Sequence, residues 1–411
     1  MKTPLCRVTT RALHRIAPLE ADGLIADALR RCGQREFVDD SFAGPLRVLL
    51  QAVQEEARLS LFGHLAARFD ALRCLTNVLR LEREEARDPA ILQRPIERPI
   101  VITGLPRSGT TFLHSLLALD PAIAVPRSWQ LIYPYPTRPV RSTCDRRRAR
   151  VERQLALFRL LSPGLSGMHP MTADSPQECT DITAHVFQSL RFDTMYRIPS
   201  YRDWLDGHGH HSAYRFHRRF LQHLDAQGPS GRRWVLKCPD HVFALDALRA
   251  AYPDAHIVMV HRDPLSVLAS VARLTEILRR PFSCHLDRAQ IGQEISERWA
   301  QGVGIMMATH AHDRTIVHVR YPELVLDPLH VVRRLYGHWG MTLGAQAAER
   351  MAQYVHQWPR GGYAVHHHSL EAYGLAAPAL RERFQPYMDL LGVWPERRPA
   401  TPAIASAASL V

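Results

Sequence analysis

The chain has 411 residues, of which 46% are hydrophobic and 22% charged, so it can bury a large core and is too apolar for a disordered protein. Its 52 basic and 40 acidic residues give a formal charge of +12, which favours an anionic ligand. We do not expect that ligand to be nucleic acid, because the charge is spread along the chain and no zinc-finger, RNP or basic-zipper pattern occurs.

Seven widely spaced cysteines form no C-x-x-C pair and no disulfide framework, which indicates a reducing compartment. The first residues lack the apolar segment of a signal peptide, and no apolar run reaches the roughly 18 residues of a membrane span. We therefore expect a cytoplasmic protein without a transmembrane segment. The sequence leaves open whether it forms a homo-oligomer.

Helical spacing of apolar residues recurs between residues 12 and 88, for example over 24–29, 46–53 and 72–81. Prolines at positions 89, 95 and 99 then mark the passage into the next part of the chain. Residues 1–98 thus predict a helical N-terminal extension, which would serve in packing, in covering an acceptor site or in oligomer contacts.

Residues 99–119 predict a β-strand, a glycine loop and a helix. Gly104 and Gly109 keep the G-x-x-x-x-G spacing at which backbone N–H groups and the positive end of a helix dipole face an anion. A nucleoside triphosphatase would continue with Lys and Ser/Thr, but Thr110 and Thr111 stand there, and the cation is Arg107 inside the loop. We expect a phosphate cradle without the usual lysine.

Residues 106–111 read PRSGTT and resemble the 5′-phosphosulfate loop of the sulfotransferases, in the form seen in tyrosylprotein sulfotransferases and bacterial relatives. Those enzymes bind the 3′-phosphate of 3′-phosphoadenosine 5′-phosphosulfate (PAPS) with an Arg and a Ser eight positions apart, and Arg262 and Ser270 have that spacing. The resemblance implies a P-loop-like fold, PAPS as co-substrate and no metal. The nucleotide-binding residues that it implies are Arg107, Ser108, Gly109, Thr110, Thr111, Arg262, Ser270 and Tyr321.

Two of the basic residues are lysines, Lys2 and Lys237, and the others are arginines. Lys237 lies in the predicted strand 234–238, at the strand end where an open parallel sheet places its chemistry. Its retention in such an Arg-rich chain suggests a task for a compact ammonium. The resemblance assigns this lysine to the sulfuryl group and the bridging oxygen. His241 follows, and it either takes a proton from the acceptor or is a surface residue.

The general base stays open. Counted from the loop, the catalytic glutamate of the tyrosylprotein enzymes falls on Ser128, with Gln130 two positions on, and neither can take a proton. Bacterial relatives resemble this chain around Glu178 and His169, so that either could face the acceptor. Glu178 could equally cap a helix, because residues 175–178 have capping-box spacing. The residues to which we assign catalysis are Arg107, Lys237, Glu178 and His241.

The whole chain predicts an α/β fold with a mainly parallel sheet flanked by helices. Strands are expected at 99–104, 234–238, 256–262 and 315–321. We place a PAPS-binding core at 99–345, a helical C-terminal part that closes the site at 346–394, and a disordered tail at 395–411. Residues 145–161 predict a helix with one basic face, which is typical of a solvated surface.

Three further features concern ligands. Tyr321 resembles the tyrosine that contacts adenine in the family, or it packs in the core. Arg360, Gly361 and Gly362 resemble the loop that closes the nucleotide site. The histidines match no metal-ligand spacing, so no metal site is expected at positions 208, 210, 211 and 366–368.

Together these features predict transfer of a sulfuryl group from PAPS to a hydroxyl or amine of a small-molecule or lipid-like acceptor, with release of adenosine 3′,5′-bisphosphate. One alternative is a nucleotide-dependent kinase, which would need a carboxylate for Mg²⁺, and Asp263 is the candidate. The other is a nucleotide-binding module without catalysis.

Overall fold

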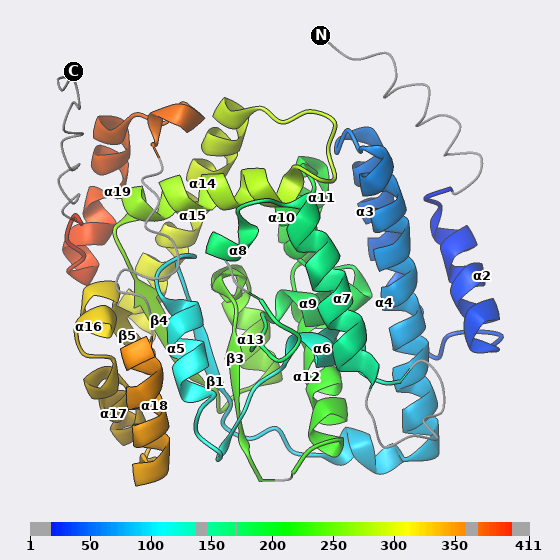
Figure 1. The fold of residues 1–411 in the computed structure, drawn as a ribbon, viewed down its shortest axis with the longest axis horizontal. Coiled ribbons are helices and arrows are strands. Elements are labelled where there is room, and N and C mark those ends of the chain that lie inside the picture. Colours follow the sequence, from blue (N-terminus) through cyan, green and yellow to red (C-terminus); the bar gives the residue numbers. More distant parts are fainter. Residues whose placement is uncertain (1–17, 137–145, 169–170, 230, 358–368, 397–411) are drawn as a thin grey trace, which may run out of the picture.

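A five-stranded parallel sheet forms the centre of the molecule (Figure 1). The computed structural model describes residues 18–136, 146–168, 171–229, 231–357 and 369–396. Its strands are β1 (Ile100–Gly104), β2 (Ile123–Ala124), β3 (Arg233–Lys237), β4 (His256–His261) and β5 (Val317–Arg320). They lie in the order β2-β3-β1-β4-β5, with Ile100 of β1 opposite Val235 and His256. The fold class and the four predicted strands are confirmed, whereas the short β2 was not predicted.

Helices make up most of the rest of the described chain, and none of them has the length and apolar content needed to cross a membrane. Before β1 come α2 (Ala21–Cys32), α3 (Ala43–Glu55), α4 (Leu61–Arg87) and η1 (Pro89–Gln93). Between β1 and β3 lie α5 (Thr110–Leu117), α6 (Ser128–Ile132), α7 (Arg146–Leu161), α8 (Leu165–Met168), α9 (Thr180–Thr183), η2 (Ala184–Val186), α10 (Arg191–Met195), α11 (Pro199–His208) and α12 (His211–Ala226). After β3 follow η3 (Pro239–Ala244), α13 (Leu245–Ala251), α14 (Pro264–Arg279), α15 (Arg288–His312), α16 (Tyr321–Leu326), α17 (Pro328–His338), α18 (Ala345–Gln357), η4 (Glu371–Tyr373) and α19 (Ala377–Leu391).

The helices bury both faces of the sheet, as expected for parallel strands. On one face, Ile100 and Ile102 pack with apolar residues of α5, α17 and α18. On the other, Val101 belongs to a larger core formed with α4, α12, α14 and α15. That core extends to Leu24 of α2 and to Phe384 of α19, two helices that lie at opposite sides of the molecule in Figure 1. The helical extensions therefore share the packing of the sheet, while the division into 1–98, 99–345, 346–394 and 395–411 stays a prediction.

The described cysteines are of two kinds, four free thiols and one disulfide-bonded residue. Cys32, Cys74, Cys179 and Cys238 are free thiols. Cys284, in contrast, is disulfide-bonded, which the wide spacing of the cysteines did not indicate. Linear spacing failed here because a disulfide depends on which cysteines the fold brings together.

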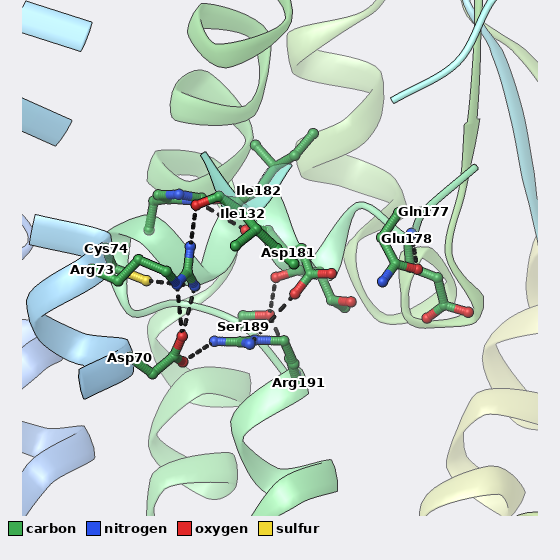
Figure 2. Close-up of polar contacts among 12 residues, drawn as sticks. Asp70, Arg73, Cys74, Ile132, Gln177, Glu178, Asp181, Ile182, Ser189 and Arg191 are labelled. Carbon is green, nitrogen blue, oxygen red and sulfur yellow. Dashed lines mark hydrogen bonds and ion pairs between the residues drawn. The ribbon is translucent and has the colours of Figure 1, made fainter. Parts of the chain in front are cut away.

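A network of charged side chains ties α4 to α10 (Figure 2). Nη2 of Arg73 lies 2.6 Å from Oδ1 of Asp70, and Arg191 donates to the other carboxylate oxygen of Asp70. Arg191 also lies 3.5 Å from Asp181, which directly follows the first residue of α9. Because all four groups are largely shielded from solvent, this network fixes three separate segments of the chain relative to one another.

Candidate functional site

The loop between β1 and α5 has the backbone that its glycines predicted. Gly104 has a φ of +121°, and a Cβ there would lie 2.2 Å from the carbonyl oxygen of Val260. Gly109 has a φ of +92° and precedes α5, which begins at Thr110. Ser108 is buried and donates from Oγ to the Leu105 carbonyl at 2.5 Å, so its hydroxyl holds the loop in shape. The loop thus presents backbone N–H groups at the N-terminus of a helix, the arrangement expected of a phosphate cradle.

Arg107 brings two distant parts of the chain together. Its backbone is left-handed, with a φ of +60°, and its Nε donates to Oγ of Ser270 at 3.1 Å. Its carbonyl accepts a bond of 2.6 Å from Nη1 of Arg262, and its Nη1 donates to the Met168 carbonyl at 2.9 Å. Burial, followed by the adjacent charge of Arg262, lowers the pKa of Arg107. The residues predicted to bind the 5′ and 3′ anions are therefore one connected cluster that holds two arginines.

Arg262 is held on two sides. Its Nε and Nη2 pair with both carboxylate oxygens of Glu396, at 2.6 and 2.9 Å. Its guanidinium lies over the ring of Tyr321, 3.9 Å from the ring centre. Glu396 falls in the predicted tail, and sequence reasoning missed it because no local pattern links it to Arg262. A carboxylate therefore occupies the anion-binding edge of this arginine.

Lys237 lies beside the cradle, at the carboxyl end of β3. It is 1% exposed, and its Nζ donates to Oγ1 of Thr111 at 3.1 Å and to Oε1 of Glu178 at 2.5 Å. The Cys179 N–H donates to the Lys237 carbonyl at 3.1 Å, which anchors the Glu178 segment to the strand end. The predicted lysine, threonine and glutamate thus meet at one point.

Glu178 does not cap a helix, so that interpretation is wrong. α9 begins at Thr180 and has no side-chain cap, while the Glu178 carboxylate points to Lys237. The Glu178 segment runs beside the stretch in which the tyrosylprotein enzymes carry their glutamate. Ser128 and Gln130 there bond to local backbone, through the Ser175 carbonyl and the Arg127 N–H respectively. Neither residue is among those that line the cleft described next.

Thr111 and Glu178, the partners of Lys237, line one large cleft of about 2710 Å³, well above the roughly 300–1,000 Å³ of common ligand pockets. Its polar end contains Arg107, Thr110, Thr111, Glu178, Asp240, Arg262, Ser270 and Tyr321. Its other end is lined by Phe62, Leu65 and Phe69 of α4 and by Leu157 and Phe158 of α7. Asp70, Arg73, Asp181 and Arg191, whose contacts Figure 2 shows, also line the cleft. The cleft has room for an anionic nucleotide and for a long apolar molecule.

Comparison with known proteins agrees with this geometry. The family model described as "Sulfotransferase family" matches residues 99–344. The chain belongs to the sulfotransferase family. Sulfotransferase STF1 from Mycobacterium tuberculosis H37Rv, a solved structure, is 34% identical, with a TM-score of 0.77 over 89% of this chain and 98% of that one. STF9 from Mycobacterium avium is 28% identical, with a TM-score of 0.81 over 92% and 98%.

Among curated proteins, this sulfotransferase is similar to omega-hydroxy-beta-dihydromenaquinone-9 sulfotransferase Stf3 of Mycobacterium bovis and Mycobacterium tuberculosis. The identity is 26% over 268 residues, which is 62% of this chain. The match spans 66% of the length of these relatives, a little under two thirds. It therefore supports the family and leaves the acceptor to be argued from the cleft.

His241 lies outside the sulfotransferase cleft. It is buried in η3, where its Nδ1 bonds to the hydroxyl of Tyr214, and it lines a separate cavity of about 20 Å³. Burial lowers the pKa of His241 well below its usual value. The other histidine considered as a base, His169, lies outside the described residues, as do Arg360, Gly361, Gly362 and the histidines at 366–368. Of the two bases that can be placed, Glu178 is the one in the cleft.

Two aspartates complete the site. Asp240, missed in the sequence, lines the cleft, and burial together with the charge of Glu178 raises its pKa to about 7. Asp263, the kinase candidate, caps α14 by accepting from the N–H of Leu265 at 3.1 Å and from Oγ of Ser266 at 3.1 Å. Its Oδ2 also accepts from the Glu396 N–H. These bonds leave it poorly placed to bind Mg²⁺. Within the described residues, no three His, Cys, Asp or Glu side chains gather into a metal site.

Proposed function

We propose that this sulfotransferase moves a sulfuryl group from PAPS to the hydroxyl, or an amine, of a long apolar acceptor and releases adenosine 3′,5′-bisphosphate. The observation that carries the proposal is the contact of Arg107 with both Arg262 and Ser270. One molecule with two anionic ends could contact Arg107 and Arg262 at the same time. PAPS is such a molecule.

In the proposed reaction the acceptor oxygen attacks sulfur, and the bond from sulfur to the bridging phosphate oxygen breaks. Lys237 and Arg107 stabilise the negative charge that grows on the sulfuryl and bridging oxygens. Glu178 takes the acceptor proton. Its carboxylate lines the cleft and lies 2.5 Å from Lys237 Nζ, which keeps it beside the reacting groups. Loop N–H groups, Thr110 and Thr111 hold the 5′ end of the nucleotide, and Arg262 and Ser270 hold its 3′-phosphate.

The acceptor class follows from the apolar end of the cleft. Phe62, Phe69 and Leu157 offer an alkyl or isoprenoid chain apolar contacts. The Stf3 relatives are named for a hydroxylated menaquinone, which has the same chemistry. We propose a lipid-like alcohol as the acceptor.

The test combines binding and transfer. Calorimetry in EDTA should show that adenosine 3′,5′-bisphosphate binds and that ATP does not. Incubation with ³⁵S-labelled PAPS should place label on an ω-hydroxylated menaquinone. ATP binding that requires Mg²⁺ would indicate a kinase instead, and nucleotide binding with no label on the lipid or on a simple phenol would indicate a module without catalysis.

Replacing Arg262 should weaken the bisphosphate selectively. We expect Arg262→Ala to cost about 1.5–3 kcal/mol, roughly 10- to 150-fold in Kd, because a charge-assisted bond to the 3′-phosphate is lost. Adenosine 5′-phosphate, which lacks that group, should bind nearly as before. Glu396→Gln is the matched control and should tighten the bisphosphate, since the phosphate no longer displaces a carboxylate from Arg262. Equal losses for both nucleotides would contradict the assignment.

Replacing Glu178 tests the base. Glu178→Gln should lower kcat by about 10²-fold, the lower range for general-base catalysis, with the bisphosphate affinity nearly unchanged. Asp240→Asn provides the comparison, because it removes the neighbouring carboxylate of the cleft. If Asp240→Asn abolished transfer while Glu178→Gln retained the full rate, the base would be Asp240.

A further inference from the structure

The exposed surface of α4 is apolar along its first turns. From Leu61 to Leu79, the exposed positions are Leu61, Leu65 and Phe69, which are four residues apart and so share one face of the helix. On α7, Leu157 and Leu160 are exposed, the latter to 78%. These five side chains, here called the leucine face, are five of the eleven large apolar side chains that are exposed in the described part of the chain. Such a concentration indicates an interaction surface.

The leucine face continues into the cleft. Leu65, Phe69 and Leu157 belong to both. Phe282 joins the two helices, since its ring stacks on Phe62 of α4 at 5.6 Å and on Phe158 of α7 at 5.9 Å between centres. The apolar surface of the two helices is therefore continuous with the apolar lining of the cleft.

The charge on α7 identifies the partner. The helix has six arginines and a single acid, Glu152, which accepts from the Ala173 N–H and pairs with Arg159. The exposed positions of the helix are Arg146, Arg148, Ala149, Arg153, Ala156, Leu157 and Leu160. Exposed arginines and leucines outnumber the acids on this face, where Glu152 pairs with Arg159 and Asp174 with Arg148, and such a composition is typical of a helix that lies on an anionic membrane. A second copy of the chain fits less well, because a two-fold contact through this face would bring arginines toward arginines.

We infer that the leucine face and the exposed arginines of α7 dock the protein on an anionic lipid bilayer, from which an apolar acceptor enters the cleft between α4 and α7. The identity of the molecule that enters the cleft rests on the proposed function, whereas the docking on a bilayer does not. The inference also revises the expectation that the basic face of residues 145–161 is merely solvated.

The experiment is vesicle flotation of the full chain without PAPS or acceptor, which separates docking from sulfuryl transfer. The protein should float with phosphatidylglycerol vesicles and not with phosphatidylcholine vesicles. The double variant Leu61→Asp, Leu160→Asp, neither of which lines the cleft, should bind at least tenfold more weakly, as should Arg146→Glu, Arg153→Glu. Val38→Asp, at an apolar position that is 86% exposed outside the leucine face, is the control and should bind as the parent does.

Three results would overturn the inference. The first is parental binding by the Leu61→Asp, Leu160→Asp variant, which would reduce the effect to general attraction of a +12 chain. The second is a failure of the parent protein to float with either vesicle while it still binds adenosine 3′,5′-bisphosphate, which would show a folded protein that does not dock. The third is a concentration-dependent dimer in ultracentrifugation that the same variant disrupts, since the occupant would then be a second copy.

Discussion

Lys237→Ala is expected to lower kcat by about 10³-fold, the upper range for removing one group that stabilises a transition state. The ammonium is buried at the end of β3 and reaches both Thr111 of the cradle and Glu178. In the proposed reaction it stabilises the charge that grows on the leaving oxygen, so its loss should affect the transition state more than the bound nucleotide. The affinity for adenosine 3′,5′-bisphosphate should accordingly stay within a few-fold of the parent value.

Single-turnover transfer from ³⁵S-labelled PAPS measures this effect without interference from product release. Lys237→Met is a useful second variant, because it keeps the volume of the side chain and tests whether any loss comes from a cavity. Lys237→Arg should recover little, since guanidinium is a poor replacement for a compact ammonium in a site fitted to it. A parental rate in Lys237→Ala would remove the lysine from the mechanism.

The local parts of the site could be predicted from the sequence. Gly104 and Gly109 determine the shape of the loop through their own backbone angles, and a buried apolar run before each strand end locates Lys237 and Arg262. Parallel strands then bring these ends to one edge of the sheet. For the same reason the fold class could be predicted, and the resemblance to the sulfotransferases implied that Arg107 and Arg262 serve one nucleotide.

The remainder of the site depends on contacts between segments that have no common sequence pattern. Glu178 had a capping-box spacing, but a backbone bond from Cys179 to Lys237 places its carboxylate in the cleft. His241 stood near the lysine in sequence, yet η3 directs it into a buried cluster with Tyr214. Glu396 reaches Arg262 across 134 positions. No rule based on local spacing would have found these three arrangements.

Asp70→Asn is expected to destabilise the protein by about 3–5 kcal/mol, the cost of breaking a buried charge pair by removing one partner. The substitution keeps the shape of the side chain but leaves Arg73 and Arg191 facing one another without the carboxylate between them (Figure 2). Urea unfolding at neutral pH measures the loss. Asp22→Asn, which breaks an exposed bridge to Arg47, is the control and should cost less than about 1 kcal/mol.

The pH dependence separates this network from a simple packing effect. Burial alone would raise the pKa of Asp70, but the charges of Arg191 and Arg73 outweigh it and hold the pKa well below its usual value. A lowered pKa in the folded state contributes stability that is complete above the unfolded value of about 3.9 and is lost as the pH falls toward the folded value. The difference in stability between parent and Asp70→Asn should therefore be constant above about pH 5 and shrink in acid. A difference that stayed constant down to pH 3 would mean that the carboxylate is not stabilised by these arginines.

Because Asp70 and Arg191 also line the cleft, the variant should raise the KM for the acceptor while the Kd of adenosine 3′,5′-bisphosphate stays unchanged.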